Sequence, residues 1–234
     1  MIDLPSPNHG ERRDGAPIDI LLIHYTGMPT CAAALARLTD PAAQVSAHYL
    51  IDEDGTTWRL VREERRAWHA GTGFWAGERD VNSRSIGVEL VNPGHEWGYR
   101  AFPAAQMEAL AALAGAIMGR HGIRPRRVLG HSDVAPSRKE DPGELFDWEG
   151  LARLGIGVWP DLRPDPAEPA PPARAGDGQA AHLLARYGYE TDGPGGLQAA
   201  VTAFQRHFHP TALGACWDRE HTRRIAALLR GPEA

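Results

Sequence analysis

Cysteine is scarce in this chain of 234 residues, which holds only Cys31 and Cys216. Two cysteines so far apart in sequence argue against a disulfide framework and against a cysteine-based metal site. If the chain binds a metal, histidine and carboxylate side chains must therefore supply the ligands.

An excess of positive charge and long apolar runs are also missing. The formal net charge of -5 leaves no general basic field for nucleic acid. No apolar stretch is long enough to span a bilayer. Residues 1–8 lack a basic stretch followed by an apolar one, so no secretory leader is predicted. We expect a cytoplasmic monomer, with the periplasm as the alternative location if a leader has been removed.

Lysine is the rarest charged residue. Lysine and arginine total 25, yet Lys139 is the single lysine. A lone lysine in an arginine-rich chain is expected where an ammonium group is specifically required, because the guanidinium of arginine is planar and bulkier. Survival by chance is the alternative, and composition alone does not separate the two.

Proline divides the chain. The stretch 160–172 holds six prolines. Because proline fixes φ and removes a backbone donor, this stretch is expected to be an extended, semi-rigid linker. We predict a large domain over residues 1–160, a linker over 161–176 and a small domain over 177–234.

The large N-terminal part mixes strand and helix patterns. The apolar run 18–23 predicts a strand buried on both faces. Residues 49–51 and 56–60 predict a hairpin around Asp54-Gly55, and 127–130 a short strand.

Residues 85–91 alternate as in a strand, and an apolar stripe between Pro103 and Gly122 predicts a long helix. Strands interleaved with helices indicate an α/β fold, with a mixed central β-sheet flanked by helices. The small C-terminal part predicts three short helices. Their clearest apolar stripe is Leu197, Ala200, Val201, Phe204 and Phe208.

Two histidines stand at the ends of predicted strands. His24 follows the run 18–23, and His131 follows 127–130, ten residues before Asp141. Catalytic zinc sites typically use three protein ligands and leave a fourth position for water. Ordinary histidines at strand ends are the alternative, and spacing alone leaves both open.

Six motifs occur together in order. They are SPN (6–8), IHYTG (23–27), VSAHYLIDEDG (45–55), AWHAG (67–71), NSRSIGVELVN (82–92) and GHSDVAPSRKEDPG (130–143). Over residues 6–160 the chain resembles the N-acetylmuramoyl-L-alanine amidases of the AmpD and AmiD type, relatives of the phage lysozyme-type amidases and of the peptidoglycan-recognition proteins. The resemblance implies hydrolysis of the amide between N-acetylmuramic acid, or its 1,6-anhydro form, and L-alanine. The substrates would be peptidoglycan fragments (muropeptides), in cell-wall turnover and recycling.

The resemblance also implies roles for single residues. The residues that match the family's ligands of Zn²⁺ are His24, His131 and Asp141. Glu89 matches the proposed general base, and Lys139 the lysine that stabilises the oxyanion. The strand pattern agrees for Glu89, because alternation places it beside Gly87 on one face, where the glycine leaves room for substrate. A glutamate on a solvent-facing edge is the alternative.

Other positions carry weaker implications. The catalytic tyrosine that precedes the motif histidine in phage lysozyme-type relatives is Ala47 here, which leaves the base role to Glu89. His48 and His69 are candidates for lining the cleft and binding substrate, with a structural role as the alternative. Arg84 is a candidate for binding the carboxylates of the peptide stem. Four aromatics are candidates for stacking on sugar, with a place in the core or the cleft wall as the alternative. They are Trp68, Phe74, Trp75 and Trp97.

The C-terminal part has a resemblance of its own. LLARYGY (183–189) and LQAAVTAFQRHFHP (197–210) resemble the three-helix peptidoglycan-binding module of wall hydrolases. A helical cap that only stabilises the amidase is the alternative. For the whole chain, the alternative is a non-catalytic peptidoglycan-recognition protein. Such relatives typically lack the third zinc ligand, so the presence of Asp141 favours an enzyme.

Overall fold

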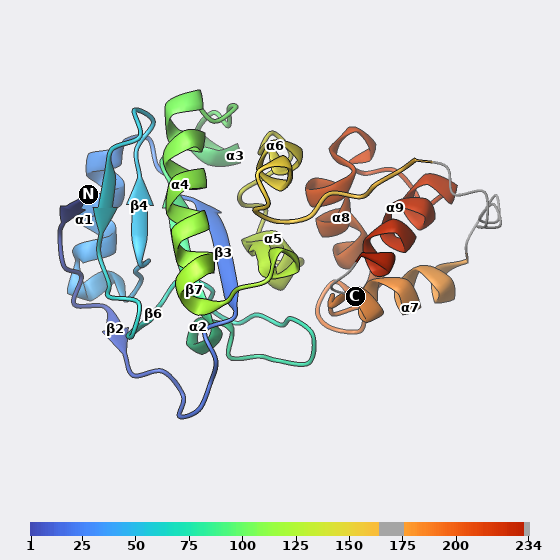
Figure 1. The fold of residues 1–234 in the computed structure, drawn as a ribbon, viewed down its shortest axis with the longest axis horizontal. Helices are drawn as coiled ribbons and strands as arrows, with labels where there is room; N and C mark the ends of the chain where they lie inside the picture. Colours follow the sequence, from blue (N-terminus) through green and yellow to red (C-terminus); the bar gives the residue numbers. More distant parts are fainter. Residues whose placement is uncertain (164–175, 232–234) are drawn as a thin grey trace.

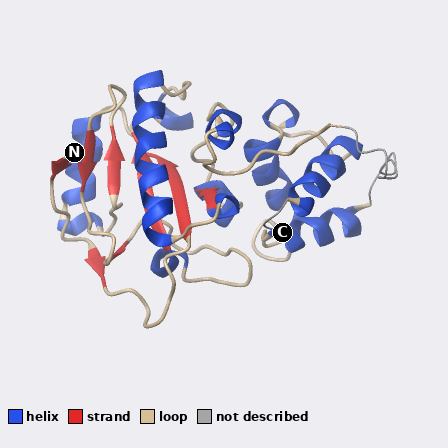
Figure 2. Ribbon diagram, in the orientation of Figure 1, coloured by secondary structure: helices blue, strands red, loops and turns tan. Residues whose placement is uncertain are grey.

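The computed structural model describes residues 1–163 and 176–231, which form a mixed sheet with helices on both faces, followed by three C-terminal helices (Figures 1 and 2). The strands are β1 (Ile2–Asp3), β2 (His9–Gly10), β3 (Ile20–Tyr25), β4 (Tyr49–Ile51), β5 (Thr57–Arg59), β6 (Arg66–Ala67), β7 (Ser85–Leu90) and β8 (Val128–Gly130). The α-helices are α1 (Cys31–Thr39), α2 (Val81–Arg84), α3 (Gly94–Trp97), α4 (Ala104–His121), α5 (His131–Val134), α6 (Trp148–Arg153), α7 (Asp177–Tyr187), α8 (Gly196–Phe208) and α9 (Arg219–Arg230). Short 3-10 turns cover Pro41–Ala43, Pro125–Arg127 and Pro210–Ala212.

Six strands form the main sheet, in the order β1-β5-β4-β7-β3-β8. Strands β4, β7, β3 and β8 run parallel to one another, whereas β4 and β5 form the predicted antiparallel hairpin. The predicted α/β class with a mixed sheet is confirmed. Strand β3 begins and ends two residues later than the apolar run suggests, so His24 lies within the strand.

Helix α4 covers one face of the sheet and crosses in front of it in Figure 1. Leu21 and Ile23 of β3 alternate onto this face and pack against Leu110 and Ile117 of the helix. Each such side chain contributes about 1.5–3 kcal/mol when it is fully buried. The helix ends as predicted at Gly122, whose φ of 65° is a left-handed conformation that glycine adopts without strain.

The opposite face is divided into two apolar clusters with polar side chains between them. Near β4, Leu50 packs against α1. Near β8, Leu22 belongs to a cluster that extends into α8. Between the two clusters the same face presents His24 and Glu89, which are paired in the parallel register of β3 and β7. The sheet therefore leaves a polar gap at the carboxyl ends of its central strands, where open α/β sheets bind ligands.

The C-terminal helices are packed against the rest of the protein. Trp75, which is 2% exposed, meets Tyr187 and Tyr189 edge-on with ring centroids 5.9 and 5.0 Å apart. The backbone N–H of Ala76 donates to the carbonyl of Gly188 at 2.9 Å. One apolar core thus continues from the sheet into the three predicted C-terminal helices. Most of the predicted linker lies outside the described residues, and the domain boundaries stay a prediction.

Within residues 1–163 and 176–231, no helix has the length and apolar character needed to cross a membrane.

Candidate active site

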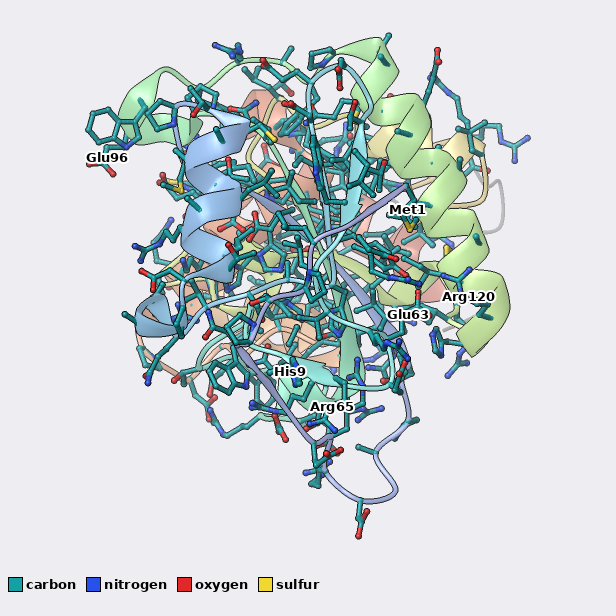
Figure 3. All side chains as sticks on the ribbon, turned by 90° about the vertical axis from the view of Figure 1, so that its left-hand side faces the viewer. Met1, His9, Glu63, Arg65, Glu96 and Arg120 are labelled. Atoms are coloured by element: carbon teal, nitrogen blue, oxygen red, sulfur yellow. The ribbon has the colours of Figure 1, made fainter. Side chains whose placement is uncertain are left out.

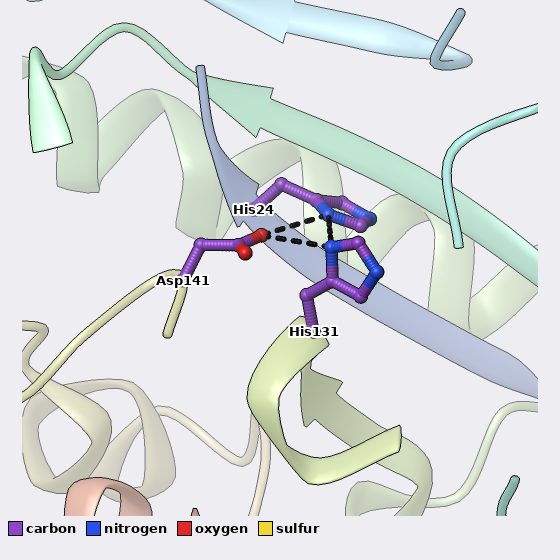
Figure 4. Close-up of side chains that lie close together, drawn as sticks. All are labelled: His24, His131 and Asp141. Carbon is purple, nitrogen blue, oxygen red and sulfur yellow. Dashed lines mark hydrogen bonds and ion pairs between the residues drawn. The ribbon is translucent and has the colours of Figure 1, made fainter. Parts of the chain in front are cut away.

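His24, His131 and Asp141 meet at the carboxyl ends of β3 and β8 (Figure 4). Nδ1 of His24 lies 2.9 Å from Nδ1 of His131, and these atoms lie 3.0 and 3.1 Å from Oδ2 of Asp141. The three residues are 1%, 3% and 5% exposed. Their ligand atoms lie within 4.8 Å of one another, so the predicted trio forms a possible metal site.

The second ring nitrogen of His24 is engaged by a chain of hydrogen bonds. Ser85 Oγ donates to the carbonyl of Val81 at 2.7 Å, so toward His69 Nε2, at 3.3 Å, it acts as an acceptor. His69 Nδ1 then carries a lone pair, which accepts from Nε2–H of His24 at 3.0 Å. This assignment follows from the hydrogen-bond network. It leaves the Nδ1 lone pair of His24 facing the other two ligands.

His131 is held in the same way. Its Nε2 donates to the carbonyl of Ala70 at 2.9 Å, which leaves its Nδ1 as a second lone pair. Burial, reinforced by His131, lowers the pKa of His24 to about 4, so its imidazole is neutral at pH 7. Three lone pairs this close repel one another unless a cation lies among them, and two nitrogens with one carboxylate oxygen suit a divalent metal.

Gly87 makes room for His69. A Cβ at position 87 would lie 2.5 Å from both Cγ and Nδ1 of the imidazole. The space beside Glu89 that the strand pattern assigns to substrate is therefore filled by His69, and that expectation is wrong. The ring of His69 instead forms part of the cleft wall and supports His24.

Glu89 and Lys139 line the same cleft as the three ligands. Oε2 of Glu89 is buried and has no hydrogen-bond partner among the described residues. Burial, and next the charge of Asp141, raise the pKa of Glu89 well above its usual value, while Lys139 opposes them in part. A carboxyl group with a raised pKa and an unengaged oxygen beside a metal site is suited to taking up and releasing a proton.

The cleft above the ligands has a volume of about 450 Å³. Trp68, one of the aromatics proposed to stack on sugar, belongs to its wall, together with Arg37 of α1 and Glu96 of α3. Arg37 and Glu96 are missed by the sequence analysis, because no motif surrounds them and only the packing of α1 and α3 brings them to the cleft. A larger hollow of about 770 Å³ lies between β5 and α4, where Glu63 pairs with Arg120 (Figure 3).

Two of the residues predicted to bind substrate do not line the cleft. His48 is fully buried, its Nδ1 accepts from the N–H of Gly87 at 2.9 Å, and burial lowers its pKa to about 3. Arg84 lies at the other end of β7, where it pairs with Asp19 and Glu78. The contacts of both are structural, which favours the alternative for His48 and gives the proposed role of Arg84 no support. Two of the other aromatics proposed to stack on sugar do not line the cleft either, since Trp75 is part of the core and Trp97 is 58% exposed.

The sequence profile of the N-acetylmuramoyl-L-alanine amidases matches residues 14–144, more than half of the chain. The chain belongs to this amidase family. AmiD of Escherichia coli is 40% identical over 230 residues, which cover 91% of this chain and 82% of AmiD. The 1,6-anhydro-N-acetylmuramyl-L-alanine amidase AmpD of the same species is 33% identical over 162 residues, which cover 62% of this chain and 86% of AmpD.

Solved structures agree with the family assignment. The structure of E. coli AmiD with anhydro-N-acetylmuramic acid-L-Ala-D-γ-Glu-L-Lys superimposes with a TM-score of 0.82 at 38% identity, over 95% of this chain and 93% of that one. AmpDh3 of Pseudomonas aeruginosa gives a TM-score of 0.76 at 29% identity, over the full length of both chains. The predicted family is confirmed, and the protein is a hydrolase of amide bonds.

Proposed function

We propose that this amidase cleaves the amide bond between N-acetylmuramic acid, in its 1,6-anhydro or reducing form, and L-alanine in peptidoglycan fragments, and that it uses Zn²⁺. The observation that carries the metal is the convergence of three lone pairs from His24, His131 and Asp141. Both outer ring nitrogens are already engaged, by His69 and by the carbonyl of Ala70. The substrate class is supported by the relative that was solved with an anhydromuropeptide.

The metal and two side chains divide the chemistry. Zn²⁺ bound by the three ligands would polarise the scissile carbonyl and make water more acidic. Glu89 accepts the proton of the attacking water while the new C–O bond forms. It then delivers that proton to the nitrogen of L-alanine, so the C–N bond breaks and an amine leaves. A raised pKa suits both steps, because the group must gain and lose a proton near neutral pH.

Lys139 supports the electrostatics of the same step. Its side chain lines the cleft beside Glu89 and Asp141. An ammonium there stabilises the negative charge that develops on the carbonyl oxygen. This role accounts for the single lysine in a chain that otherwise uses arginine.

The test combines zinc content with hydrolysis of anhydro-N-acetylmuramic acid-L-Ala-D-γ-Glu-L-Lys. We expect one zinc per chain and release of the free peptide. Glu89→Gln should keep the metal and lose activity by ~10²–10⁴-fold. Glu144→Gln is the matched control, because this half-buried carboxylate pairs with His95 and does not line the cleft. Cleavage rates for the anhydro and reducing forms of the substrate then establish which one is preferred.

Two outcomes would contradict the proposal. A native protein that holds zinc and binds the muropeptide without cleaving it would be a peptidoglycan-recognition protein. A native protein that cleaves the muropeptide while holding no metal would refute the zinc assignment and leave the substrate assignment in place.

A further inference from the structure

The segment 130–143 carries most of the chemistry but little regular structure of its own. It contains His131, Lys139 and Asp141, and its one helix, α5, is four residues long. The rest of the segment runs through turns. Its internal contacts include the backbone N–H of Ser132 donating to the carbonyl of Asp141 at 2.9 Å. Such a segment needs support from outside if its two ligands are to stay oriented toward His24.

A buried carboxylate of this segment is held by the C-terminal part of the chain, through helix α8 and the loop between α7 and α8. Asp133, two residues after the ligand His131, is 1% exposed. Its Oδ2 accepts from the N–H of Gly130 at 2.7 Å and contacts Nδ1 of His207 in α8 at 2.7 Å. Its Oδ1 accepts from the hydroxyl of Tyr189 at 2.6 Å. A carboxylate this deeply buried is tolerated only with such partners, and two of its three partners come from the C-terminal part.

The supporting side chains are themselves fixed. The imidazole of His207 is 2% exposed and stacks on Trp148 with ring centroids 3.7 Å apart. Tyr189 is 1% exposed and packs against Trp75. Neither side chain can follow a movement of Asp133 without disturbing the shared core, so the contact acts as a rigid attachment.

A second attachment reaches the other ligand. Arg206, the neighbour of His207 in α8, pairs with Glu140 at 2.9 Å, and Glu140 lies between Lys139 and Asp141. Helix α8 therefore holds the segment at two points, one beside each of its metal ligands.

We propose that the C-terminal helices are a clamp that positions the metal-ligand segment, with His207, Tyr189 and Arg206 as positioning residues that act through Asp133 and Glu140. The inference rests on the proposed metal site. It gives the C-terminal part a role in the chemistry of the amidase that does not depend on binding to the cell wall. In this role the helices raise the affinity for zinc. His131 and Asp141 are already held in position, so they lose less conformational freedom when zinc binds.

The test uses conservative variants of the full chain. Tyr189→Phe removes one hydroxyl from Asp133 and keeps the ring. Arg206→Ala removes the link between Glu140 and α8 and leaves Glu140 with His95, 3.5 Å away, as its remaining partner among the described residues. Tyr187→Phe is the matched control, because it removes a hydroxyl that bonds to Arg126 at the same interface, and this hydroxyl is not one of the three hydrogen-bond partners described for the Asp133 carboxylate. His207→Gln is the strongest variant. If it does not fold, the two milder variants still decide the question.

Two readouts are needed. The first is zinc affinity by competition with a chelator, where we expect about tenfold weaker binding for Tyr189→Phe and Arg206→Ala and no change for Tyr187→Phe. The second is amide hydrogen exchange of the metal-free protein, where residues 130–143 should exchange faster in the first two variants only. Unchanged affinity and unchanged exchange in both variants would overturn the clamp. Because the exchange experiment contains no metal, it decides the clamp even if the native protein binds no zinc.

Discussion

Replacing Gly87 by alanine tests the arrangement behind the metal site most directly. The new Cβ would lie 2.5 Å from Cγ and Nδ1 of His69 and 2.7 Å from its Cδ2. Carbon atoms in contact stay about 3.5–4.0 Å apart, so the imidazole must move by roughly 1 Å. The 3.0 Å hydrogen bond from His24 to His69 then exceeds hydrogen-bonding distance.

The expected cost has two parts. Overpacking should destabilise the fold by about 1–3 kcal/mol. Loss of the partner that orients His24 should weaken zinc binding by about 10–100-fold. The sign of the change in folding stability is informative. Gly87 has no positive φ, so without a clash alanine at this position would stabilise the strand by roughly 0.5–1 kcal/mol.

A double-mutant cycle isolates the cause. His69→Ala alone should also weaken zinc binding, but in that background Gly87→Ala has no ring to displace and should change neither zinc affinity nor stability for the worse. Zinc affinity is measured by chelator competition, and stability by urea unfolding of the metal-free protein. Gly115→Ala in α4 is the control substitution, since nothing lies within 4 Å of its added Cβ. Equal losses from Gly87→Ala in both backgrounds would refute the reasoning.

Three further outcomes follow from the site and from the buried residues around it. Glu89 must be ionised to accept a proton, so kcat/KM should rise with pH by about one decade per pH unit below the pKa of Glu89. The midpoint of this rise should lie above 4.5, the ordinary pKa of glutamate. A kcat/KM that is constant from pH 4.5 to 7 would contradict this. Asp141→Asn should lose zinc on dialysis, yet in metal-free form it should resist urea better than the native chain, because an amide N–H can donate to a lone pair of His24 or His131; equal metal-free midpoints would argue against repulsion among the ligands. The folded state keeps the pKa of His48 at about 3 against an ordinary 6.5, so as pH falls below 6.5 only the unfolded chain gains this proton and stability drops by ~1.4 kcal/mol per pH unit. In metal-free His48→Asn the dependence of unfolding free energy on pH between 4.5 and 6.5 should be less steep by that amount, and identical slopes would show the expectation to be wrong.

The parts of the site that depend on strands are predictable from sequence. Apolar runs place His24 and His131 at the ends of predicted strands. Alternation puts Glu89 on one face of its strand, and in the sheet this face also carries His24. Parallel strands bring their carboxyl ends to one edge, so strand prediction alone goes far toward placing these side chains together. The family motifs then supply the role of Asp141, which lies in a turn where no periodic pattern constrains it.

The parts that depend on packing between distant segments are not predictable in this way. His69 and Gly87 are adjacent only because the loop after β6 folds over the sheet. The contact of Asp133 with His207 joins residues 74 positions apart, and nothing in the local sequence of either one signals it. Arg84 shows the converse error. It is close to Glu89 in sequence, but the extended strand β7 separates the two residues, so Arg84 lies at the opposite end of β7 and outside the cleft.

The three metal ligands differ in what holds them. His24 is fixed by the hydrogen-bonded register of β3 between β7 and β8, directly after four fully buried residues of the same strand. His131 and Asp141 stand on a segment with one short helix, which is held on one side by Arg138 donating to the carbonyl of Ala70 and on the other by α8. The carbonyl of Ala70 also receives Nε2–H of His131, so one backbone oxygen ties the position of the segment to the orientation of the ligand. A disturbance in the C-terminal helices should therefore reach His131 and Asp141 and leave His24 in place. The geometry of the metal centre should then be more sensitive to changes in α8 than to changes in the sheet that carries His24.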